Sequence, residues 1–508
     1  MIKAFVITLA TTMLFASQAS IAASKTHLNI SSPWEVNSYE PSVSGSAFYS
    51  LGVMETLVDA TVEGVLIPGL ATKWEMSDDG LSWRFSIREG VSFHDDSLLT
   101  ANVAANALQK AFDNPGMLKK APILTIHADQ NDVVVTLDKP FSSLPALMTH
   151  NTTVISAPSS INKDGAHIAA IGTGPFAVDT FTPPQGLNVK RFDNYWGDKA
   201  KLETVSYLAT SRAETRALLA ESGDADLVFS LDPSGFTRLA KVDSVKTKMT
   251  PIPRVVTLKL NAGHAFLNDP RARRALSLAM DRIGIATAIT RFPEGSATQL
   301  FPPALDQWHN EALEPLYQDV KAAKNLLAEL GWTPGDDGIL NRNGERFSLI
   351  LRTFTDRPEL PLIAAALQDQ WRTIGVELNV SIGSYSEIPA GHKDGSLHVA
   401  LYARNYGITP DPIGAALQDF GAGGGDWGAM NWENANVAQA LEKIATTSDP
   451  VARNKNIATV VESIHNELPL IPVVWYQHIV SVAKDLQGYT IDPLERKFRL
   501  EDVFWDEK

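Results

Sequence analysis

Hydrophobic and polar positions along the chain follow two periods, one of two residues and one of about 3.6 residues. The alternating period, typical of β-strands, is found at Trp83–Arg88, Pro122–His127, Asp132–Leu137, Phe176–Phe181, Phe347–Thr353 and Val399–Ala403. The helical pattern and its boundary residues predict helices at Phe48–Leu57, Ala101–Phe112, Phe141–Met148, Thr210–Ser222, Asp319–Leu330 and Pro361–Ile374. Strands and helices therefore share the whole chain.

Turn and cap residues separate these elements. Asp78-Asp79-Gly80 lies between a short strand around Trp74 and the strand at Trp83–Arg88, which predicts a hairpin. Thr100 is a good N-cap for the helix that follows it. Asp269 and Pro270 likewise predict the cap and first turn of a helix that runs to about Arg282.

Chain length and charge limit the architecture and the class of partner. A single core rarely exceeds about 250–300 residues, so 508 residues predict at least two lobes. Hydrophobic residues make up 44% and charged residues 20%, which favours a globular chain over a disordered one. The formal net charge of −14 argues against nucleic acid or an anionic membrane as the main partner.

The first 23 residues resemble a cleavable secretory signal. Lys3 precedes an apolar run at 4–16, and Ser20–Ala23 supplies small residues for cleavage. The run is shorter than the about 20 residues that a membrane-spanning helix needs. The chain has no cysteine, which excludes disulfides, thiolate metal sites and a lipid anchor on an N-terminal cysteine. We therefore expect an exported, unanchored protein of the periplasm.

A long motif with fixed spacing carries a family resemblance. Its positions here are Glu55, Leu57, Gly64, Pro68, Leu70, Ala71, Trp74, Ser77, Asp79, Gly80, Trp83, Phe85, Arg88, Gly90, Phe93 and His94. The pattern resembles the signature of the solute-binding proteins of ABC importers, peptide/nickel-binding family 5. Asp96 departs from it, because glycine is usual there. The segments Ile171–Phe176 and Asn268–Arg282 also resemble the family, and the likeness extends over most of Leu28–Val480.

The resemblance implies an α/β fold of two lobes, a type II periplasmic binding protein with an extra subdomain in the first lobe. The expected division is a signal peptide at 1–23, a first lobe at 24–258, a second lobe at 259–476 and a return to the first lobe at 477–508. The inserted subdomain is expected at about 65–170. The chain is expected to cross between the lobes at Val255–Asn261 and to return at Ile471–Tyr476.

The segment Val399–Pro412 is the most informative about the ligand. A strand delivers Arg404, Asn405 and Tyr406 to a loop that, in the resembled family, lines the cleft between the lobes. Peptide-binding members carry there an Asp that pairs with the peptide's α-amino group, and this chain has Ile408. A buried ammonium group without a carboxylate partner is costly, so ordinary α-amino capture is not expected at this position.

The spacing of Tyr406, Gly407, Asp411 and Pro412 is closer to the nickel-chelate branch, with Tyr in place of Trp. That branch has a metal-contacting His in the next loop, whereas 419–431 contains none. The paired arginines of that branch are also missing, since His150 and Asn151 occupy the region. Neither a resident metal nor a cofactor is expected, although His150 remains an alternative metal contact.

The expected pocket combines aromatic walls with polar contacts. It comprises Trp34, Phe48, Tyr49, His150, Asn151, Arg404, Asn405, Tyr406 and Trp427. Arg404 is expected to clamp a carboxylate bidentately, with a structural salt bridge as the alternative. For Trp427 the alternative is an anchor of a surface loop, and for Trp34 it is packing on the first lobe.

The resemblance implies capture of a small solute, of peptide or nickel/metal-chelate type, and its delivery by a monomer to an ABC permease of the inner membrane. Enzyme signatures such as His-Glu-x-x-His, Gly-x-Ser-x-Gly and the P-loop are absent from the sequence, so no catalytic residue is expected. A ligand sensor that docks to a membrane receptor and a periplasmic hydrolase remain as alternatives.

Overall fold

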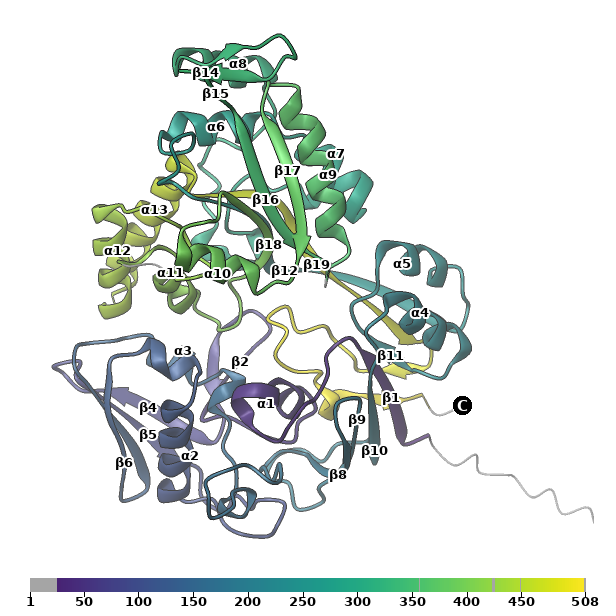
Figure 1. The fold of residues 1–508 in the computed structure, drawn as a ribbon. Helices are drawn as coiled ribbons and strands as arrows, with labels where there is room; N and C mark the ends of the chain where they lie inside the picture. Colours follow the sequence, from purple (N-terminus) through teal and green to yellow (C-terminus); the bar gives the residue numbers. More distant parts are fainter. Residues whose placement is uncertain (1–24, 356, 423–424, 448, 507–508) are drawn as a thin grey trace, which may run out of the picture.

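A single ten-stranded sheet runs through both halves of the molecule (Figure 1). The computed structural model describes residues 25–506 except 356, 423, 424 and 448, so the expected signal segment lies outside the described residues. The strands of this sheet, in spatial order, are β17 (Glu377–Gly383), β16 (Ser348–Phe354), β18 (Val399–Asn405), β12 (Val245–Leu260), β19 (Leu470–Ala483), β11 (Leu227–Val228), β1 (His27–Ser32), β10 (Thr204–Ala209), β9 (Gly186–Arg191) and β8 (Phe176–Thr182).

A separate four-stranded antiparallel sheet forms the inserted part of the first lobe. Its spatial order is β4 (Ala71–Met76), β5 (Ser82–Ile87), β7 (Asp132–Leu137) and β6 (Ile123–Asp129). Smaller sheets pair β2 (Val58–Ala60) with β3 (Leu66–Pro68), β20 (Leu486–Gln487) with β21 (Phe504–Trp505), and β13 (Thr333–Pro334) with β14 (Leu340–Arg342) and β15 (Glu345–Arg346). The alternation predicted for β5, β7, β8 and β18 is thus present as paired strands.

The helices cover these sheets. In the first lobe and its insertion they are α1 (Pro41–Ser50), α2 (Ala101–Asp113), α3 (Leu144–Leu147), α4 (Ala213–Ser222) and α5 (Pro233–Leu239). In the second lobe they are α6 (Pro270–Leu278), α7 (Arg282–Ile285), α8 (Val320–Glu329), α9 (Glu359–Arg372), α10 (Glu387–Asp394), α11 (Ile413–Phe420), α12 (Ala435–Thr446) and α13 (Pro450–Glu467). Thr100 caps α2 and Asp269 caps α6, as the sequence predicts.

The helix expected at Phe48–Leu57 is wrong in its placement. The structure has α1 at Pro41–Ser50, with the Glu40 side chain accepting from the Ser42 N–H and Pro41 at the first turn. Gly52 follows with φ of 67°, a left-handed conformation that ends the helix. The residues beyond Ser50 form turns because the signals that begin this helix lie upstream of Phe48.

Two long strands connect the lobes. β12 and β19 pair antiparallel along most of their length, with irregularities between Pro251 and Val255 and between Val256 and Thr257. On one side of this irregular region β19 pairs with β11 of the first lobe, and on the other side β12 pairs with β18 of the second lobe. Pro251 and Pro253 lack a backbone donor, which explains why the ladder breaks there.

Candidate functional site

The carboxyl ends of parallel strands from both lobes open onto one cleft. β1, β10 and β11 are mutually parallel in the first lobe, and β16, β17 and β18 are parallel in the second. The cleft is lined by residues just beyond the ends of these strands, such as Trp34, Arg212, Ser230, Arg357 and Tyr385. In open α/β sheets this edge is where ligands bind. The crossing strands β12 and β19 form its floor.

The cleft is large and unusually cationic. Its volume is about 1910 Å³, whereas pockets for drug-sized ligands span about 300–1,000 Å³. Eight cationic side chains line it: Arg212, Arg216, Arg238, Lys241, Arg254, Arg291, Arg357 and Arg404. The acidic side chains in the same lining are Glu214, Asp232, Glu359 and Glu495. The described part of this acidic chain therefore collects positive charge where the lobes face each other.

Four of the nine residues in the expected pocket line the cleft. Trp34 lies beyond β1 and is 42% exposed, with its ring against Phe229 and His478. Arg404 and Asn405 end β18, and Trp427 lies across from Tyr402 in the second lobe. The structure thus brings Trp34, Arg404, Asn405 and Trp427 together around one space.

The other five residues lie outside that lining. Phe48 and Tyr49 are buried in the core of the first lobe, and Tyr406 is fully buried against Phe301 in a core shared by both lobes. His150 accepts the Thr152 N–H at Nδ1 in the turn after α3, and Asn151 starts the next turn. Phe48, Tyr49 and Tyr406 are thus fully buried, and His150 and Asn151 are half-buried, so none of the five lines this cleft.

Arg404 already has a carboxylate partner. Its Nε and Nη2 donate to the two oxygens of Asp419 at 2.8 and 2.7 Å, and the Asp419 side chain is fully buried. Burial lowers the pKa of Arg404, but the adjacent Asp419 raises it by more, so the net shift is upward. The bidentate clamp expected for a ligand is therefore made within the protein, as the salt-bridge alternative predicts.

Arg357 has no such partner. It lies in the loop after β16 and donates to the hydroxyl of Tyr476 at 3.2 Å, with its guanidinium 5.3 Å from the centre of that ring. Within the described residues, no carboxylate lies within ion-pair distance of it. Burial lowers the pKa of Arg357, while Tyr476, Glu359 and Glu495 together raise it by more. A partly buried guanidinium with unused N–H groups thus faces the cleft.

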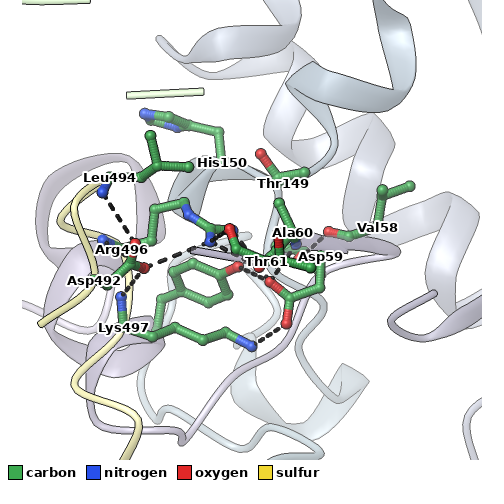
Figure 2. A network of polar contacts seen from close by, with 12 residues as sticks. Val58, Asp59, Ala60, Thr61, Thr149, His150, Asp492, Leu494, Arg496 and Lys497 are labelled. Carbon is green, nitrogen blue, oxygen red and sulfur yellow. Dashed lines mark hydrogen bonds and ion pairs between the residues drawn. The ribbon is translucent and has the colours of Figure 1, made fainter. Parts of the chain in front are cut away.

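The C-terminal segment 492–497 reaches into the cleft from the first lobe. The Oδ2 of Asp492 accepts the N–H groups of Arg496 and Lys497, and Oδ1 accepts that of Leu494. Arg496 Nη1 and Lys497 Nζ donate to the carboxylate of Asp59 in β2 at 3.1 and 2.5 Å. Figure 2 shows the two cations turned toward this carboxylate. Two carboxylates, Asp59 and Asp492, and two cations, Arg496 and Lys497, thus hold the backbone on both sides of Glu495.

Glu495 itself lines the cleft. Its Oε2 accepts from Arg254 Nη2 at 2.8 Å and from Asn405 Nδ2 at 3.1 Å. Its Oε1 lies 3.4 Å from Arg254 Nη1 and 3.9 Å from Nδ1 of His478. That Nδ1 is buried and has no hydrogen-bond partner among the described residues. Burial lowers the pKa of His478, so the ring is neutral near pH 7.

The sequence reasoning missed Arg254, Arg357, His478 and Glu495. They lie at four separate places in the chain, with His478 and Glu495 17 residues apart, and no motif links them. One signal was available for Arg357, since it follows a strand that runs parallel to its neighbours and therefore ends at a ligand-binding edge. Nothing comparable marks Glu495, whose position depends on the return of the C-terminal segment.

Neither a metal-binding cluster nor a membrane-spanning helix is present in the described residues. Within residues 25–506 and their stated gaps, no group of three or more His, Cys, Asp or Glu side chains is arranged to hold a metal ion. Over the same part of the chain, no helix combines the length and apolar character needed to cross a membrane.

Known proteins match the chain over nearly its whole length. A glutathione-binding protein, GsiB, of Escherichia coli K12 is 23% identical over 96% of this chain and 95% of its own. Among solved structures, NikA of Brucella suis in complex with Fe(III)-EDTA is similar with a TM-score of 0.85 and 22% identity, over 94% of this chain and 100% of that one. The oligopeptide-binding protein AppA of Bacillus subtilis, in complex with a nonapeptide, gives 0.79 and 19%, over 95% and 99%.

A family model matches residues 65–427, more than half of the chain, and carries the description "Bacterial extracellular solute-binding proteins, family 5 Middle". The matched relatives are binding proteins rather than enzymes, and the ligands in their names and titles are glutathione, Fe(III)-EDTA and a nonapeptide. Taken with the two-lobed sheet and the cleft, this match shows that the chain belongs to family 5 of the bacterial extracellular solute-binding proteins, the substrate-binding components of ABC importers.

Proposed function

We propose that this protein captures a carboxylated solute, of peptide or anionic metal-chelate type, and hands it to an inner-membrane permease. The observation that carries the proposal is Arg357, the cleft guanidinium whose side chain, among the described residues, donates to a phenol and to no carboxylate. A partly buried cation without a counter-ion is unfavourable. A ligand carboxylate bound there would supply the missing charge and the missing acceptors.

The position of Arg357 also suits closure of the lobes. It belongs to the second lobe, whereas Trp34 and Arg212 on the facing wall belong to the first. A ligand must bind the closed form better than the open form in order to shift the protein toward it. A solute that contacts Arg357 and the first-lobe wall together meets this requirement.

The cleft volume favours a solute larger than one amino acid. The relatives GsiB and NikA carry glutathione and Fe(III)-EDTA in their names, and both of those compounds bear several carboxylates. In the proposed site Trp34 and Trp427 form apolar walls and Asn405 supplies an amide. Arg404 lines the same wall, but its donor edge is occupied by Asp419 and its charge is balanced there.

The proposal also covers the export of the protein and its role in transport. Residues 1–23 act as a cleavable signal, the mature chain carries no lipid anchor, and the monomer delivers its solute to an ABC permease without catalysing a reaction. The complete absence of cysteine supports the lack of a lipid anchor on the mature N-terminus. The division at 24–258, 259–476 and 477–508, with an insertion at 65–170, remains part of the same proposal.

Isothermal titration tests the proposal with glutathione, Fe(III)-EDTA and tripeptides of uncharged side chains, and compares each tripeptide with the same sequence amidated at the C-terminus. We expect the carboxylated forms to bind and Arg357→Gln to weaken them by about tenfold or more, as expected for the loss of charged hydrogen bonds. Arg372→Gln is the matched control, because Arg372 is exposed at the end of α9 and lies outside the cleft lining. Equal binding of amidated and carboxylated peptides, or no effect of Arg357→Gln, would overturn it.

A further inference from the structure

Glu495 is held in a backbone conformation that side chains rarely adopt. Its φ is 55°, in the left-handed region, although the residue is neither glycine nor asparagine. Backbone strain of this kind persists only where the surrounding structure fixes it, and it gathers at ligand sites. Contacts around Glu495 must therefore hold its backbone in this conformation.

The surrounding network supplies the restraint. Asp492 accepts three backbone N–H groups of the segment, and Arg496 and Lys497 clamp Asp59 on the far side (Figure 2). Arg496 also donates to the carbonyl of Ala60 at 2.8 Å. These contacts balance two cations with two carboxylates, so the network needs nothing from Glu495. Its effect is to present the Glu495 side chain to the cleft.

The Glu495 carboxylate retains acceptor capacity on the cleft side. Its Oε2 has two good partners, Arg254 and Asn405, whereas Oε1 has only the long contact of 3.4 Å to Arg254. An ionised carboxylate offers about four acceptor positions. Oε1 is also the oxygen nearer to His478, whose Nδ1 lacks a partner. An incoming donor would thus find a free acceptor at Oε1.

The loop after β18 brings an apolar side chain to the cleft. Ile408 lines the cleft and offers no acceptor from its side chain. Of the acidic side chains in the lining, Glu495 and Glu359 both lie close enough to Arg357 to raise its pKa. Glu359 begins α9 on the second-lobe rim, while Glu495 projects from the first lobe toward the crossing strands. Glu495 thus approaches the proposed carboxylate anchor from the other lobe, since its partner Arg254 and Arg357 both lie over the ring of Tyr476.

We propose that Glu495 accepts an ammonium group of the solute, so that the cleft selects zwitterionic, peptide-like solutes with the carboxylate at Arg357 and the amine at Glu495. This inference rests on the proposed function, because it takes the carboxylate position from it. Glu495 would then determine specificity from the C-terminal segment, and an amine-free chelate would be a poorer solute than a free peptide. The strained conformation at residue 495 would serve to aim the carboxylate between Arg254 and His478.

Native mass spectrometry of the full-length mature protein, incubated with three competing forms of one tripeptide, tests whether Glu495 accepts an ammonium group. One third of the mixture has both termini free, one third is N-acetylated and one third is C-amidated. We expect wild-type protein to retain the free form over the acetylated form by about tenfold or more, and Glu495→Gln to abolish that preference. Glu214→Gln is the matched control, since it removes the same charge from the cleft rim.

The outcomes separate the two proposals. Equal retention of free and acetylated peptides by wild-type protein, with amidated peptides excluded, would overturn the role of Glu495 and leave the carboxylate site standing. Retention of amidated peptides as strongly as free ones, or no retained peptide at all, would overturn both. The wild-type comparison needs no variant, so a lack of preference would overturn the proposal even if Glu495→Gln unfolds because Arg254 loses its partner.

Discussion

At the scale of single residues, Arg404 forms with Asp419, inside the protein, the bidentate carboxylate contact that it was expected to offer to a ligand. The guanidinium lies at the end of β18, where a ligand clamp was expected, and its donor edge is filled by a fully buried carboxylate. Removing one partner of such a pair leaves the other buried and unpaired. The Arg404–Asp419 pair therefore contributes mainly to the stability of the fold, and only secondarily to ligand binding.

Arg404→Gln should destabilise the protein strongly. Breaking a buried pair by removing one partner costs about 3–5 kcal/mol, and the shift in urea denaturation midpoint measures it. Arg271→Gln is the control, because Arg271 meets Asp269 on the exposed surface and its loss should change little. A midpoint equal to that of the control would show that Asp419 is solvated and the pair weak.

The sequence indicates which residues have side chains suited to binding more reliably than it indicates where those residues lie in the fold. Trp34, Arg404 and Asn405 lie at or just beyond strand ends, so the alternation of β1 and β18 was enough to bring them to the cleft, whereas Trp427 lies in the loop after helix α11. Phe48 and Tyr49 belong to α1, whose start was misplaced, and their burial depends on packing against strands from elsewhere in the chain. Contacts of that kind have no local pattern to reveal them.

At the scale of elements, the crossing strand β12 lies against the loop after β18. The Tyr406 N–H donates to the carbonyl of Pro253 at 2.8 Å. A Cβ placed on Gly407 would lie 2.0 Å from Cγ of Pro253 and 3.2 Å from Cδ2 of Leu494. The close approach explains why a glycine stands at 407, in terms of space rather than of its φ angle.

Gly407→Ala should push the loop away from the crossing strand. Overpacking of this kind costs about 1–3 kcal/mol, and we expect a lower urea midpoint together with weaker solute binding, because Asn405 and Glu495 flank the same contact. Gly186→Ala in β9 is the control, since its Cβ would meet Thr182 at an ordinary 3.5 Å. Equal midpoints for the two variants would contradict the steric argument.

Elements with their own start and stop signals were predictable, and those without them were not. The hairpin at Asp79-Gly80 and the helices α2 and α6 follow from caps and turn residues that act within a few positions. The full length of β12 and β19, by contrast, depends on their pairing with each other across more than 200 residues of chain. The pairing of β12 with β19, including its interruption at the prolines, is determined by tertiary contacts rather than by the local sequence.

At the scale of the whole molecule, the lobes also meet away from the ligand cleft. Ser142 and Ser143, from the insertion in the first lobe, contact helices of the second lobe. Ser142 donates to the carbonyl of Ala445, and Ser143 Oγ donates to Asp411 at 2.8 Å. The apolar residues Leu144 and Leu147 share one core with Ala416 of α11. Opening of the cleft about β12 and β19 must separate this interface or carry its helices along.

Ser143→Ala should therefore shift the protein toward an open form without touching the cleft. Asp411 keeps its partner Arg453 at 2.6 Å, so the change removes one inter-lobe hydrogen bond and leaves no carboxylate unpaired. A hydrogen bond of this type contributes about 1 kcal/mol, and a smaller closed population lowers apparent affinity in proportion. We expect about fivefold weaker binding of the best carboxylated probe and a larger radius of gyration in X-ray scattering of the unliganded protein.

Lys139→Ala is the control for that variant. Lys139 pairs with Glu442 at 3.1 Å across the same interface, but both side chains are more than half exposed, so the pair contributes little. If Ser143→Ala weakened binding while the radius of gyration stayed at the wild-type value, the hydrogen bond would act on the ligand site by another route. If neither quantity changed, the second-lobe helices α11–α13 would move as one body with the first-lobe insertion, and the opening motion would have to occur within the second lobe.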